Sequence, residues 1–77
     1  MAVTLEDIKA IKPGTTEAFN CESGAMFYVA TALSTLKRKP EDMPLGIVGY
    51  EHKKFFDKNI IVIRALREGD EKVLNNK

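Results

Sequence analysis

The chain has 77 residues, a net charge of +1 and a charged fraction of 30%. A chain of this length forms one domain and buries only about 60% of the surface that it exposes when unfolded, so its core is thin. Its only cysteine, Cys21, and its only histidine, His52, exclude an internal disulfide and a zinc cluster, and the net charge excludes a polycation.

The first seven residues read Met-Ala-Val-Thr-Leu-Glu-Asp and lack the basic start and apolar run of a signal peptide. No apolar stretch of the sequence approaches the length that spans a bilayer. A single unpaired cysteine fits a reducing compartment. We therefore expect a cytoplasmic protein that does not contact a membrane.

The N-terminal third predicts a short helix and a strand. Thr4 and Asp7 have the spacing of a helix cap, which favours a helix over Leu5–Ile11. Pro13-Gly14 then predicts a turn. A strand is expected over Thr15–Cys21, with Phe19 pointing toward the core.

A longer helix is predicted from Gly24 to Lys39, with Ser23 as its N-cap and Pro40 as its end. Apolar residues recur there at spacings of three and four, which places them on one face. These residues are Met26, Val29, Ala30, Leu33 and Leu36. Residues 40–44 are expected to form a loop.

A hairpin is predicted next, with arms over Gly46–Phe56 and Ile60–Leu66. Residues 57–59 suit a three-residue loop closed by a left-handed Asn59, with Phe56 and Ile60 flanking the turn on the same face. The β-branched run at 60–63 favours a central strand.

These elements predict an α+β fold in the order β-α-β-β with a short helical lead-in. One main helix would cover a small three-stranded antiparallel sheet. We expect a single domain over residues 1–77, of which residues 68–77 would be a frayed tail.

The sequence offers no recognisable catalytic apparatus. Cys21 and His52 lie on different predicted elements, and no third group is placed to orient them. The turn at residues 12–16 has one glycine and lacks the pattern of a phosphate-binding loop. We therefore expect a protein that is not an enzyme and has no cofactor, metal ion or evident small-molecule substrate.

One face of the long helix is a candidate binding surface. Residues 24–39 contain no Asp or Glu, whereas a solvated helix face usually carries both signs of charge. Hydroxyls and cations without acids suit phosphate contacts. The candidate residues opposite or beside the apolar stripe are Tyr28, Thr31, Thr35, Arg38 and Lys39. A contact with another subunit and an ordinary surface are the alternatives.

The hairpin adds a second basic feature. Lys53, Lys54 and Arg64 are its candidate nucleic-acid contacts, and His52, Lys58 and Arg67 add to the basic character against a single acid, Asp57. A basic two-stranded ribbon can enter a DNA groove, and the aromatic residues at 50, 55 and 56 also suit single strands. Alternatively, lysines protect an edge strand from aggregation, and the aromatic rings belong to the core.

Three short segments carry a resemblance: Ile11-Lys12-Pro13-Gly14, then Phe19, then Ile61-Val62-Ile63-Arg64. In this pattern the chain resembles small proteins of Bacteroides-type gut bacteria and of their phages and mobile elements. The resemblance implies a bacterial or mobile-element origin and no catalytic residues. Arm-binding domains of integrases also combine a small sheet with one helix, but their helix follows three strands, whereas here it follows the first.

The sequence thus favours a non-enzymatic binding module that contacts nucleic acid. The second hypothesis is a structural or interaction protein, such as a homo-oligomer or a component of a phage or mobile element. It is motivated by the thin core and by residues 60–63, which are apolar on both faces of the predicted sheet although one helix covers only one face.

Overall fold

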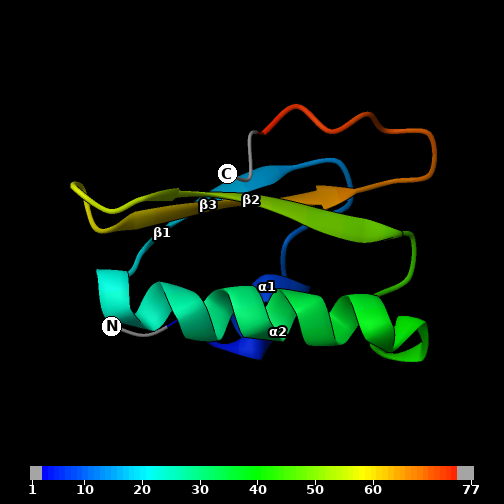
Figure 1. Ribbon diagram of the computed structural model, residues 1–77. Helices are drawn as coiled ribbons and strands as arrows, with labels where there is room; N and C mark the ends of the chain where they lie inside the picture. The colour runs from blue at the N-terminus through cyan, green and yellow to red at the C-terminus, as the bar shows by residue number, and fades with distance from the viewer. Residues whose placement is uncertain (1–2, 75–77) are drawn as a thin grey trace.

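A computed structural model describes residues 3–74 and shows two layers, with helices on one side of a sheet (Figure 1). Within the described residues, the elements are α1 (Leu5–Lys9), β1 (Thr16–Asn20), α2 (Met26–Arg38), β2 (Gly49–Phe55) and β3 (Ile60–Leu66), with 3-10 turns at Ser23–Ala25 and Pro40–Asp42. The predicted α+β fold, with one main helix on a three-stranded antiparallel sheet, is confirmed.

The strand β3 lies at the centre of the sheet, in the order β1-β3-β2. Both neighbours pair with it in antiparallel register, so that Val62 faces Ala18 on one side and Lys53 on the other. Ile61, Ile63 and Ala65 point to one face and are fully buried. The predicted central strand is therefore confirmed.

The core lies between the sheet and α2. Of the apolar stripe that the spacing predicted, Met26, Val29, Leu33 and Leu36 are buried against the sheet, and Ala30 is half-buried. The short helix α1 lies on the same side (Figure 1) and adds Ile8 to the core. Burial of these side chains is the main source of stability in so small a domain.

The start of α1 follows the prediction. The Thr4 hydroxyl accepts the N–H of Asp7 at 3.2 Å, and the Asp7 carboxylate accepts the N–H of Thr4 at 2.9 Å. This reciprocal pair satisfies two N–H groups that the first turn leaves without helical partners. The helix ends at Lys9, two residues earlier than expected.

The predicted start of the long helix and the predicted loop after it need correction. Ser23 is not its N-cap, because Ala25 holds that position without a side-chain cap, and Ser23 begins a 3-10 turn instead. The carbonyl of Glu22 accepts the N–H groups of Ala25 and Met26, so a serine hydroxyl is not needed there. After the helix, Pro40 starts a second 3-10 turn where a loop was expected.

The hairpin loop is longer than predicted. Phe55 pairs with Ile60, which leaves four residues in the loop rather than three, and the expected flanking pair of Phe56 and Ile60 is wrong. The N–H of Lys58 donates to the Phe55 carbonyl, and this turn takes Phe56 out of the strand. Asn59 is left-handed, as predicted, with φ of 52°.

The chain after β3 turns back over the face of the sheet that the helices leave uncovered (Figure 1). Arg67 and Asp70 close the turn through an ion pair of 3.1 Å. Arg64 then donates to the Glu71 carbonyl at 2.8 Å, and the Val73 N–H donates to Glu51 Oε1 at 3.1 Å. We call residues 67–74 the return segment. The last three residues of the predicted frayed tail, 75–77, lie outside the described residues.

Candidate nucleic-acid interface

The outer face of α2 is exposed, as its spacing predicts, but its hydroxyls are engaged. Tyr28 is 79% exposed, and Thr31 and Thr35 are also exposed. The Thr31 hydroxyl donates to the Phe27 carbonyl at 2.8 Å, and the Thr35 hydroxyl donates to the Thr31 carbonyl at 3.0 Å. Each hydroxyl has one proton, so neither can donate to a phosphate without breaking its hydrogen bond to the helix backbone.

The predicted helix residues and hairpin residues do not form one surface. Tyr28 and Arg38 lie on the side of α2 that faces away from the sheet. Lys53 pairs with Val62 in the register and therefore points to the opposite side of the sheet. Lys54 points toward the helices, where its ammonium lies over the Phe27 ring. The sheet therefore separates Lys53 from the helix residues, whereas Lys54 lies on the helix side, beside Phe27.

Two of the predicted basic residues are held in ion pairs. Arg64 Nη1 lies 3.1 Å from Glu51 Oε1, and Arg67 Nε lies 3.1 Å from Asp70 Oδ2. A cation whose charge is already balanced by a carboxylate adds little attraction for a phosphate. Arg64 therefore contributes to the architecture of the sheet rather than to a basic surface.

The hairpin end brings aromatic rings and lysines together. Lys54 Nζ lies 6.0 Å from the centre of the Phe27 ring and 5.8 Å from that of Phe56. Phe27 is 68% exposed and Phe56 is 51% exposed. These rings come from α2 and from the hairpin loop, on the helix side of β2.

A third ring, that of Phe55, lies on the other side of β2. Lys53 Nζ lies 5.4 Å from the centre of the Phe55 ring, and Lys58 Nζ lies 5.8 Å from it. All four contacts fall in the range of a cation–π interaction. We call this group the hairpin cluster; it consists of Phe27, Lys53, Lys54, Phe55, Phe56 and Lys58.

The charge of the hairpin cluster is available to a ligand. None of its three lysines forms an ion pair with a carboxylate in the part of the chain that the structure describes. His52 adds no charge near pH 7, because burial and, to a smaller extent, the neighbouring Lys54 lower its pKa. The cluster therefore presents three cations and three rings at one end of the domain.

Phe27 was missed by the sequence analysis. Its position next to the buried Met26 and the exposed Tyr28 fits neither the apolar stripe nor the polar face. A large exposed aromatic residue at the margin of an apolar stripe is the signal that was present. The contact between Phe27 and Lys54 depends on tertiary packing, so the helix sequence could not predict it.

Cys21 and His52 lie on different elements, as the sequence predicts. Cys21 follows β1, His52 lies in β2, and the central β3 separates the two strands. Burial raises the pKa of the Cys21 thiol, an effect opposite to that required for a nucleophile. Within residues 3–74, no group of three or more His, Cys, Asp or Glu side chains is placed to hold a metal ion.

Comparisons with protein-family models, with curated proteins and with solved structures gave no match. The resemblance to proteins of Bacteroides-type bacteria and their mobile elements stays a prediction. None of the helices in the described residues has the length and apolarity needed to cross a membrane.

Proposed function

We propose that this protein is a non-enzymatic nucleic-acid-binding module that holds single-stranded nucleic acid at the hairpin cluster. The observation that carries the proposal is the convergence, at one end of the domain, of three phenylalanine rings and three lysines that form no ion pair with a described carboxylate. Single-strand binding combines stacking of bases on aromatic rings with cations that follow the backbone.

The exposed rings supply stacking surfaces. Phe27 and Phe56 are more than half exposed, which is unusual for so large an apolar side chain. Each base that stacks on a ring contributes about 1–3 kcal/mol. The Lys54 ammonium lies over both rings. It can move from the rings to a phosphate without loss of an ion pair to a described carboxylate.

A single strand fits this geometry better than the groove of a duplex. A β-ribbon that reads a groove must present side chains from one face to the base edges. Here Lys53 and Lys54 point to opposite faces, and α2 covers the face of Lys54. A flexible strand can follow both sides of the hairpin end, whereas a rigid duplex cannot.

Fluorescence anisotropy with a labelled oligothymidine and with a duplex of equal length, at low salt, tests the proposal. Phe56→Leu keeps an apolar side chain but removes the ring, and should weaken single-strand binding by about tenfold. Lys53→Glu and Lys54→Glu should each weaken it more. Arg38→Glu, on the outer face of α2, is the matched control and should change little.

Failure of the wild-type protein to bind the single strand would overturn the proposal. It would also be overturned if Arg38→Glu weakened binding as much as Lys54→Glu, because the binding surface would then be the helix. Thermal unfolding of each variant separates lost binding from lost folding.

Self-association is a second candidate function, and the uncovered face of the sheet favours it. Ala18 is exposed and Ile60 and Val62 are half-buried on this face, away from the contacts of the return segment with Glu51 and Arg64. Light scattering at about 100 μM, a concentration that reveals weak association, would detect a dimer that Val62→Lys disrupts. A monomer at that concentration would exclude this candidate.

A further inference from the structure

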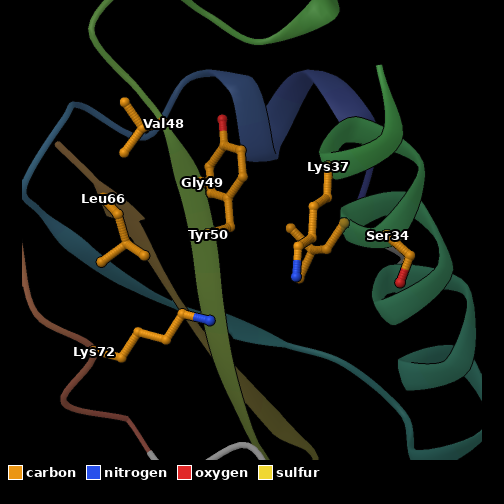
Figure 2. Close-up of a pocket in the computed structure, with 8 residues that line it drawn as sticks. Ser34, Lys37, Val48, Gly49, Tyr50, Leu66 and Lys72 are labelled. Carbon is orange, nitrogen blue, oxygen red and sulfur yellow. The ribbon is translucent and has the colours of Figure 1, made fainter. Parts of the chain in front are cut away.

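A cavity of about 310 Å³ lies between the C-terminal half of α2 and the beginning of β2 (Figure 2). Leu33, Val48 and Leu66 give it apolar walls, and Ser34, Lys37 and Lys72 give it polar ones. The hairpin cluster lies at the opposite end of β2, so the two sites are independent.

We propose that this cavity binds a small organic anion that has an apolar body. The volume is near the lower end of the range for small-molecule sites, about 300–1,000 Å³. Such a site is mostly apolar and has a few polar groups that fix the orientation of the ligand. The two lysines would hold the carboxylate, phosphate or sulfonate group of the ligand.

The charges around the cavity support an anionic ligand. Figure 2 shows Lys37 reaching from α2 and Lys72 reaching from the return segment toward the strand between them. None of the described residues that line the cavity is Asp or Glu. Neither lysine forms an ion pair with a described carboxylate. Two unpaired like charges that border one cavity repel each other, and a bound anion removes this repulsion.

Hydrogen bonds hold the backbone on both sides of Lys72. The carbonyl of Glu71 accepts a hydrogen bond from Arg64 at 2.8 Å, and the N–H of Val73 donates to Glu51 at 3.1 Å. Glu51 and Arg64 are themselves joined by an ion pair. The backbone that carries Lys72 is therefore fixed to the sheet, beside the cavity that Lys72 lines.

Gly49 keeps the cavity open at the edge of the sheet. It lines the cavity from β2 and has no side chain to fill it. A Cβ at this position would meet only Leu66 Cδ1, at 3.9 Å, which is an ordinary contact. A larger side chain there can therefore occupy the cavity without a clash in the backbone, and this gives a way to block the site while both lysines remain.

Two fluorescent probes that differ in one group test the inference. 8-Anilinonaphthalene-1-sulfonate has a sulfonate and an apolar body, and N-phenyl-1-naphthylamine has the same body without the charge. The anionic probe should bind with saturation, about tenfold more tightly than the neutral one, because a tenfold ratio is within the reach of one or two charge contacts. Amide shifts in a nitrogen-15 NMR titration should localise at Ser34 and Gly49.

Lys37→Glu and Lys72→Glu should each reduce affinity for the anionic probe by about tenfold. Lys39→Glu is the matched control, because Lys39 is an exposed lysine near the same helix end but does not line the cavity. Gly49→Val should block both probes. Thermal unfolding identifies any variant that has lost its fold.

Equal affinity for the two probes would overturn the inference, as would equal losses in Lys37→Glu and Lys39→Glu. Amide shifts confined to the hairpin cluster would also overturn it. None of these outcomes depends on nucleic-acid binding, so failure here leaves the hairpin proposal intact, and the reverse holds as well.

Discussion

Glu51 and Arg64 face each other across β2 and β3 and form an ion pair of 3.1 Å, although Glu51 is completely buried. The same carboxylate oxygen accepts the N–H of Val73. One oxygen of Glu51 therefore joins the central strand, an edge strand and the return segment.

Replacing Glu51 with Ala should destabilise the protein by about 3 kcal/mol, because it leaves the partner cation without its counter-charge. Urea unfolding measures this change. The double variant Glu51→Leu/Arg64→Leu, which removes both charges, should lose much less. If Glu51→Ala were as stable as the wild type, the ion pair would not contribute to the stability of the fold.

Acid should weaken this pair. Burial is the largest influence on the Glu51 carboxyl and raises its pKa, but the Val73 N–H and the Arg64 guanidinium act in the other direction, and the net result is a pKa below the ordinary 4.5. The unfolded chain therefore takes up the proton first as the pH falls. The stabilisation is complete above the ordinary pKa and is lost as the pH falls through the pKa of the folded state.

The difference in unfolding free energy between the wild type and Glu51→Gln should therefore be constant near neutral pH and shrink in acid. Urea unfolding at a series of pH values gives this difference directly. Parallel curves for the two proteins down to strongly acidic pH would contradict the assignment.

The hairpin loop depends on one left-handed residue. Asn59 has φ of 52°, a conformation that asparagine and glycine adopt more easily than other residues. Asn59→Ala should cost about 1 kcal/mol, whereas Asn59→Gly should change stability by less. Lys58→Ala, in the same loop, serves as the comparison. Identical midpoints for the alanine and glycine variants at position 59 would show that the loop can relax.

The affinity for nucleic acid should fall with salt concentration, with a slope set by the number of lysines that contact phosphates. Three lysines that each meet one phosphate of a single strand give a slope of about −2 for the logarithm of affinity against that of salt concentration. Lys58→Gln should reduce the magnitude of the slope by about 0.7. Anisotropy titrations over a tenfold range of salt check both values, and a slope near zero would argue against phosphate contacts.

Local signals in the sequence were sufficient for most of the fold. The β-branched run from Ile60 predicted the central strand, the cap of Thr4 and Asp7 predicted the start of α1, and Asn59 predicted the left-handed turn. Each of these features depends on neighbours in the chain. The predicted length of the hairpin loop was wrong because the turn that begins at Phe55 has no strong sequence signal.

The candidate site was harder to predict because it depends on contacts between distant residues. Whether Lys54 faces α2 or solvent follows from the strand register. The sequence indicates only a charged residue on a strand at position 51. Glu51 is buried because the return segment passes over it. The helix and hairpin residues were each expected to be basic surfaces, but only the fold reveals that the sheet separates Lys53 from α2.

The central position of β3 has a consequence for synthesis of the chain. β1 and β2 each pair with β3 and not with each other, although both precede it in the sequence. On the ribosome, therefore, neither strand has a pairing partner until β3 begins to emerge at Ile60. The sheet then forms from both sides of the last strand, and the adjacent hairpin closes over a much shorter loop than the pairing of β1 does.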